Sequence, residues 1–103
     1  MIRCEIGRYE ISLTGHAGIG VKGQDIVCSA ISTLTQTLGG YLAENAELLD
    51  AIEYDEKDGY FYLKVEPTYD AEDVIYNLFK MVAEGLKAIS EDYPRAIHVI
   101  ETA

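Results

Sequence analysis

The chain has 103 residues, of which 49% are hydrophobic and 25% are charged, so its composition is globular and excludes disordered and collagen-like chains. Its 18 acidic and 8 basic residues leave a net charge of -10, which opposes binding to nucleic acid or to an anionic membrane and favours a basic protein partner. The length suits a single domain over residues 1–103.

Apolar segments and cysteine content indicate the cellular compartment of the protein. No apolar run approaches the roughly 20 residues that cross a bilayer, and Met1–Glu5 does not begin the apolar stretch of a signal peptide. Two cysteines, Cys4 and Cys28, are too few for the disulfide framework of a small secreted domain. We therefore expect a cytoplasmic protein whose cysteines remain thiols.

The first expected elements are a hairpin and a loop. Ile2–Ile6 and Tyr9–Thr14 are rich in apolar residues around Gly7-Arg8, which predicts two antiparallel strands joined by a tight turn. Gly15–Gln24 holds four of the nine glycines, so we expect a mobile surface loop that closes when a substrate binds.

A helix is expected next, with Asp25 as its N-cap. Its apolar residues recur every three or four positions, and Gly39-Gly40 should weaken its last turns. The expected core positions are Val27, Ile31, Leu34, Leu38 and Tyr41. Cys28, Ser32 and Thr35 share the opposite side, so Cys28 need not point into the core.

The remaining elements complete a fold. Leu49–Tyr54 and Tyr60–Glu66 flank an Asp-Gly turn and predict a second hairpin with Phe61, Leu63 and Val65 on its core face. A second helix begins near Asp70 to Asp73 and stops before Pro94; its expected core positions are Val74, Leu78, Met81, Val82, Leu86 and Ile89. With a last strand over Ala96–Glu101, the order ββ-α-ββ-α-β predicts an α+β fold: a mostly antiparallel sheet with two helices on one face.

Cys28 is the side chain best placed for nucleophilic chemistry. The first turn of a helix favours a thiolate, because the positive end of the helix dipole lies there. His16, twelve residues earlier on the glycine-rich loop, could accept the thiol proton, and a cysteine with a histidine is the minimum needed for acyl transfer from an amide. The alternative is that Cys28 is a buried structural thiol. We interpret Cys4, within a strand, as a packing residue.

These residues lie in a recognisable pattern. Gly15-His16-Ala17, a short spacer and then Gly23-Gln24-Asp25-Ile26-Val27-Cys28-Ser29-Ala30-Ile31-Ser32 resemble the signature of the ribosomal-processing cysteine proteases, the Prp family. The resemblance implies that His16 and Cys28 form a catalytic dyad, supported by Gly15, Asp25 and Ser32. It implies a homodimeric thiol protease without a cofactor that removes the N-terminal extension of bacterial large-subunit ribosomal protein number twenty-seven, cutting after an aromatic pair.

Two supporting residues keep alternative roles. Asp25 either caps the helix or orients His16, and we favour the cap because an aspartate directly before a helix fits capping chemistry. Ser32 either hydrogen-bonds within the site or bonds back to its own helix. In the expected mechanism, Cys28 attacks the scissile carbonyl, His16 carries the proton, and amides at the start of the helix hold the oxyanion.

Two other functions compete with a protease. Cys4, His16, Cys28 and His98 are zinc-ligand types, but no pair has the short spacing of a structural zinc site, so we expect no metal. A non-catalytic homodimeric binding or assembly module with a structural cysteine is the stronger alternative. Cleavage of the ribosomal precursor would separate it from the protease.

The acidic residues are unevenly distributed. Eleven acids and two bases lie from Glu44 to Asp73, against seven acids and six bases in the rest of the chain. The second hairpin and the start of the second helix therefore carry almost the whole net charge. We expect this region either to attract a basic substrate or simply to keep the protein soluble.

Overall fold

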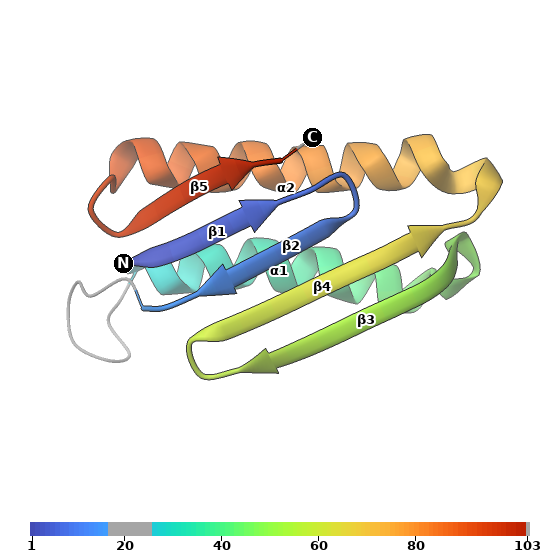
Figure 1. Ribbon diagram of the computed structural model, residues 1–103, viewed down its shortest axis with the longest axis horizontal. Coiled ribbons are helices and arrows are strands. Elements are labelled where there is room, and N and C mark those ends of the chain that lie inside the picture. The colour runs from blue at the N-terminus through green and yellow to red at the C-terminus, as the bar shows by residue number, and fades with distance from the viewer. Residues whose placement is uncertain (17–25, 103) are drawn as a thin grey trace.

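The computed structural model describes residues 1–16 and 26–102, which form a five-stranded sheet in the order β3-β4-β2-β1-β5 with two helices on one face (Figure 1). β1 pairs in parallel with β5, and the other neighbours pair antiparallel, so the predicted α+β fold is confirmed. The elements are β1 (Ile2–Ile6), β2 (Glu10–Thr14), α1 (Ile26–Glu44), η1 (Ala46–Leu48), β3 (Leu49–Lys57), β4 (Tyr60–Pro67), η2 (Tyr69–Ala71), α2 (Glu72–Asp92) and β5 (Ile97–Glu101).

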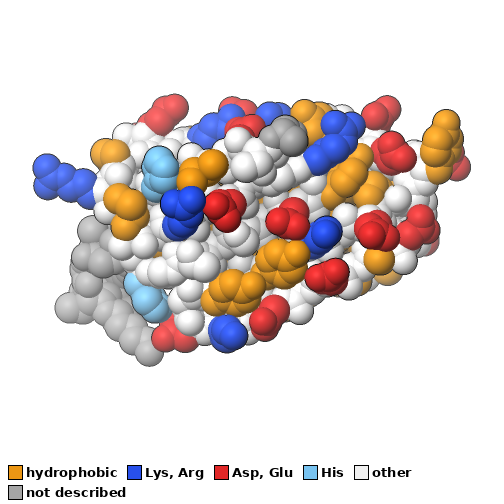
Figure 2. Space-filling view, in the orientation of Figure 1, with side chains coloured by type: hydrophobic (Ala, Val, Ile, Leu, Met, Phe, Trp, Pro, Cys, Tyr) orange, Lys and Arg blue, Asp and Glu red, His pale blue; other side chains and the backbone are white. Residues whose placement is uncertain are grey.

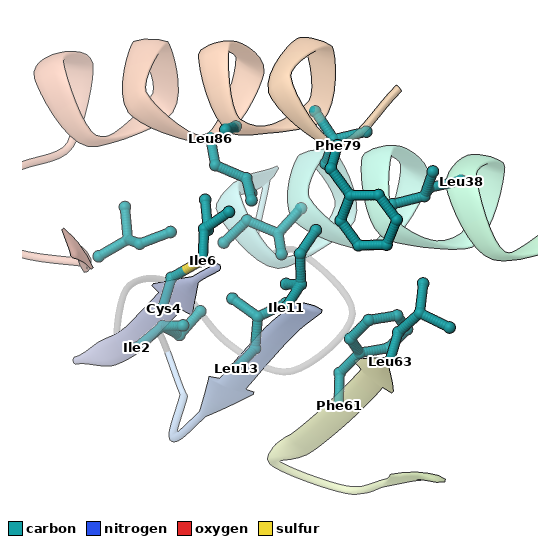
Figure 3. Packing of buried hydrophobic residues seen from close by; sticks show 14 of the residues in the cluster. Ile2, Cys4, Ile6, Ile11, Leu13, Leu38, Phe61, Leu63, Phe79 and Leu86 are labelled. Carbon is teal, nitrogen blue, oxygen red and sulfur yellow. The ribbon is translucent and has the colours of Figure 1, made fainter. Parts of the chain in front are cut away.

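The core lies between the sheet and the two helices. Alternate residues of each inner strand point to the helices, because successive side chains of a strand face opposite sides of the sheet. Figure 3 shows strand residues such as Ile11 and Leu63 directed toward Leu38 of α1 and toward Phe79 and Leu86 of α2. Cys4 belongs to this layer and is fully buried, as the sequence predicted.

The core face of α2 differs from the prediction. Val74 and Met81 are 48% and 65% exposed, whereas Ile75 and Phe79 are buried. The sequence places an apolar residue next to each of these positions, so a 3.6-residue period fits either phase of the helix. Packing against the sheet selects the phase that buries the aromatic ring of Phe79.

The later turns of α1 also differ from the prediction. Gly39-Gly40 does not weaken the helix, which continues to Glu44 because the buried Leu38 and Leu42 hold its last turns against the core. Tyr41, expected in the core, is 43% exposed. Thr35, expected on the side away from the core, is 2% exposed, and its hydroxyl donates to the Ile31 carbonyl at 3.1 Å.

The second hairpin is longer than predicted and its turn is shorter. Its strands extend to Lys57 and from Tyr60, so only Asp58 and Gly59 connect them. Gly59 has φ = 73°, the positive value that such a turn requires. β3 is an edge of the sheet, and its side chains are exposed along most of its length.

Two further expectations concern the glycine-rich loop and membrane-spanning helices. The expected loop Gly15–Gln24 lies outside the described residues except for Gly15 and His16. Among the helices of the described ranges, none is long and apolar enough to cross a membrane.

Neighbouring positions on α2 allow a direct test of the core face. Ile75→Ala should lower the free energy of unfolding by about 2–5 kcal/mol, because it removes a fully buried side chain and leaves a cavity. Val74→Ala should change it by about 0.5 kcal/mol or less, since Val74 is half exposed. Urea denaturation followed by circular dichroism measures both. Equal losses, or a larger loss for Val74→Ala, would contradict the observed orientation of α2.

Candidate active site

A pocket of about 240 Å³ opens beside the start of α1. Three parts of the chain surround it: the first three turns of α1, the N-terminal strand pair, and the turn between β3 and β4. Its lining includes the two residues predicted to be catalytic, His16 and Cys28. The other lining residues are Ile2, Leu13, Gly15, Ile31, Ser32, Thr35, Glu56, Lys57, Asp58, Gly59, Tyr60 and Phe61.

Gly15 fixes the point at which the chain leaves β2 for the pocket. Its N–H donates to the Gly59 carbonyl at 2.9 Å, so the end of β2 is tied to the β3–β4 turn. Its φ is 100°, and a Cβ at this position would collide with the carbonyl oxygen of Met1. Only glycine satisfies both conditions without strain. The backbone at the position before His16 therefore requires a glycine.

His16 lies against the β3–β4 turn. Its Nε2 is 3.9 Å from Oδ2 of Asp58, and a Cβ at Gly59 would lie 2.9 Å from the same nitrogen. The His16 and Asp58 side chains are 64% and 87% exposed, so water screens this pair and it contributes little to stability. The absence of a side chain at Gly59 is therefore what makes room for the imidazole.

Cys28 is the third residue of α1, half-buried between the core and the pocket. The prediction that it need not point into the core is consistent with this position. Cys4 differs, because burial raises the pKa of its thiol to about 12, with a smaller contribution from Glu5. A thiol that stays protonated at neutral pH is a poor nucleophile. Of the two cysteines, Cys28 alone lines the pocket.

The structure describes only some of the supporting residues named from the sequence. Ser32 lies one turn beyond Cys28, is exposed and lines the pocket. Thr35 lines its floor. Asp25 lies outside the described residues, so the choice between a cap and a histidine orienter stays a prediction. Within the described ranges, the acidic side chain paired with His16 is Asp58.

Sequence reasoning missed the contribution of the second hairpin. Glu56, Lys57 and Asp58 form one wall of the pocket, although about thirty residues separate them from Cys28. The Asp-Gly pair predicted the turn itself, but no sequence signal placed this turn beside His16. The Nζ of Lys57 lies 5.2 Å from the ring centroid of Tyr60, so the one basic side chain of this wall is directed onto an aromatic ring.

Across residues 1–16 and 26–102, no three His, Cys, Asp or Glu side chains gather closely enough to hold a metal ion.

The model of the family "Cysteine protease Prp" matches residues 1–98. The chain belongs to the Prp family of cysteine proteases. No curated protein matches the sequence.

Solved structures resemble this Prp-family chain over nearly all of its length. The protein SMU.848 from Streptococcus mutans is 31% identical, with a TM-score of 0.72 over 99% of this chain and 94% of that one. The ribosomal processing protease Prp from Staphylococcus aureus, with a covalently linked product peptide, has a TM-score of 0.81 at 21% identity over 99% and 100% of the two chains. The same enzyme with a substrate peptide has a TM-score of 0.73 at 20% identity over the same shares.

Differential alkylation tests the placement of the two cysteines in this Prp-family chain. In the folded protein at pH 8, iodoacetamide should modify one thiol, at Cys28, because Cys4 is buried and its pKa is about 12. Denaturant should expose the second thiol. Mass spectrometry of tryptic peptides identifies the modified residue, and Cys28→Ala should show no rapid labelling. Rapid modification of Cys4 in the folded state would contradict its position in the core.

Gly59→Ala tests the contact between the turn and the imidazole. A Cβ at φ = 73° is strained, so unfolding should become about 1 kcal/mol easier. The new methyl group should also displace His16, since it would lie 2.9 Å from Nε2. NMR should show altered ring-proton shifts for His16, while those of His98 on β5 stay unchanged. Unchanged His16 signals would mean that its ring does not lie on this turn.

Proposed function

We propose that this chain is a ribosomal-processing protease in which Cys28 is the nucleophile and His16 the general acid and base. The observation that carries the proposal is that both side chains line one pocket, although they come from different elements. A nucleophilic thiol and an imidazole facing the same space are the groups that cysteine-dependent amide hydrolysis requires. The family match over residues 1–98 supports the same chemistry.

In this mechanism the Cys28 Sγ forms a bond to the scissile carbonyl carbon while its proton passes to His16. The positive end of the α1 dipole stabilises the negative charge that develops on the carbonyl oxygen. The C–N bond then breaks, and His16 returns the proton to the leaving amine. A water molecule attacks the thioester, giving one proton to His16 and releasing the carboxylic acid as the Cys28 thiol is restored.

The proposed substrate is the N-terminal extension of bacterial large-subunit ribosomal protein number twenty-seven, cut after an aromatic pair. Support comes from the Staphylococcus aureus structures, whose protein is a ribosomal processing protease bound to peptides. The charge pattern also supports a basic substrate. Figure 2 shows that acidic side chains outnumber basic ones where β3 and β4 cross the exposed face of the sheet.

We also propose that the protein acts in the cytoplasm as a homodimer. The homodimer rests on the family resemblance. The location follows from the proposed substrate, because ribosomal precursors are made in the cytoplasm. A homodimer would contain two copies of the candidate active site. The oligomeric state can be measured by analytical ultracentrifugation of the purified protein.

Cleavage of the precursor tests the assignment of the dyad. Cys28→Ala and His16→Ala should each lower kcat by roughly 10³-fold or more, since each removes a group that takes part in the bond-making step. Cys4→Ala and His98→Ala are matched controls at the other cysteine and histidine, and both should retain activity. Mass spectrometry of the products measures the rate and the cleavage position. A Cys28→Ala protein that still trims the precursor would disprove the mechanism.

A further inference from the structure

A second pocket, of about 420 Å³, lies beyond the first along α1. It opens between the C-terminal half of α1 and the helix-facing side of β3, and it is mainly apolar. Its lining residues are Gln36, Gly39, Gly40, Ala43, Ile52, Tyr54, Glu56 and Leu63. No step of the mechanism above uses it.

The two pockets form a single groove. Glu56 lines both of them, so they meet at this side chain. One wall is a stripe of α1, because its lining residues recur every three or four positions and therefore lie above one another on the helix surface. These residues are Cys28, Ser32, Thr35, Gln36, Gly39, Gly40 and Ala43.

The opposite wall comes from alternate residues of β3. Ile52, Tyr54 and Glu56 face the helix side, since their cross-strand partners Val65, Leu63 and Phe61 are buried there. Ile52 and Tyr54 are nevertheless 48% and 53% exposed. Their apolar surfaces border the groove rather than the core.

The groove is deep enough for a side chain because α1 presents almost bare backbone to it. A Cβ added at Gly39 or Gly40 would have no atom within 4 Å. On the other wall, the Tyr54 ring stands edge-on to Phe61, with centroids 5.7 Å apart and planes at 87°. The Tyr54 hydroxyl also donates to Oε1 of Glu56 at 2.6 Å, and these two contacts orient the ring.

The length of the groove sets a distance from the reacting bond. Cys28 and Gly40 are twelve residues apart in α1, which corresponds to about 18 Å at about 1.5 Å per residue. An extended peptide rises about 3.3 Å per residue. The second pocket therefore lies about five residues along a peptide whose scissile bond is at Cys28.

The charges beside the groove favour a basic peptide. Among the acids of the edge strand and its turn, Glu56 lines both pockets and Asp58 lines the first, whereas Glu53 and Asp55 lie on the outer face of β3. All of these side chains are exposed, so they can interact with ligand charges in the surrounding water. An apolar channel with an acidic rim fits an extended peptide that alternates apolar and basic residues.

We propose that the second pocket is a remote substrate subsite, which binds an apolar side chain about five residues from the scissile bond of a basic, extended peptide. This inference rests on the proposed function, because it uses Cys28 as the position of that bond. The energy of remote binding would hold the peptide in register for cleavage. The pocket would thereby allow a small enzyme to distinguish its precursor from other chains with similar residues at the scissile bond.

Peptide binding to the Cys28→Ala protein tests the subsite without catalysis. The probes are fluorescein-labelled peptides of fourteen lysine- and serine-rich residues with an aromatic pair, in which one leucine is moved stepwise along the chain. Fluorescence anisotropy should show tightest binding with leucine four to six residues from the bond that follows the pair. Tyr54→Ser in this background should weaken that peptide by about 10-fold, whereas Tyr69→Ser, at an exposed tyrosine outside the groove, should not.

Gly39→Leu gives a second and independent test. A leucine there has room to enter the groove without disturbing the fold, so the protein should become more stable, because glycine is a poor helix residue. The same change should lower affinity for the leucine peptide by about 10-fold. Gly39→Ala is the matched control, with the gain in thermal stability but little loss of affinity.

Three results would overturn the subsite. The position of the leucine could have no effect on affinity, or Gly39→Leu could bind the peptide as well as the parent protein. Tyr54→Ser could instead change the sedimentation coefficient at constant peptide affinity, which would assign this face to contact between two copies of the chain. Failure of the proposed protease function would show differently, as absence of cleavage by the unmodified protein with peptide binding intact.

Discussion

The antiparallel pairing of β2 with β4 determines where the pocket forms. In this register Thr14 lies opposite Tyr60, so the end of β2 meets the β3–β4 turn. A slip of β4 by one residue against β2 would turn Phe61 from the core to solvent while Leu13 stayed buried, because side chains alternate between the faces of a strand. Burial of these residues thus fixes the register, and the register brings His16 beside Asp58. The geometry of the site follows from the packing of the core.

Backbone geometry, more than strong side-chain bonds, holds this arrangement together. The described residues leave no buried polar side-chain atom without a hydrogen-bond partner. The pair between His16 and Asp58 is exposed and weak, whereas the N–H of Gly15 and the carbonyl of Gly59 join the two segments directly. Two glycines at positive φ therefore allow a close approach that no side chain could supply. The His16 imidazole itself is exposed and is held, within the described ranges, only by its weak contact with Asp58 and by the turn beneath it.

The acidic edge strand serves two physical purposes. An exposed edge can pair with another chain and aggregate, and charged side chains are a common protection against this. β3 carries acids along an edge of this kind, while its alternate residues Ile52 and Tyr54 keep apolar surface toward the groove. The same strand can thus repel non-specific partners and attract a basic peptide. In the proposed subsite, the exposed apolar surfaces of Ile52 and Tyr54 are the wall that contacts the peptide.

The sequence by itself determined the order of the elements and the pair of candidate catalytic residues. Periodicity and turn residues are local properties, and the pattern from His16 to Cys28 resembles the signature of the family whose model matches residues 1–98. Local patterns could not set the rotation of α2, because apolar residues at Val74 and Ile75 fit two phases equally well. They also could not place the β3–β4 turn beside the pocket, since that depends on pairing between strands far apart in the chain. Tertiary packing decided both, because only the assembled core distinguishes which apolar residues are buried and which strands meet.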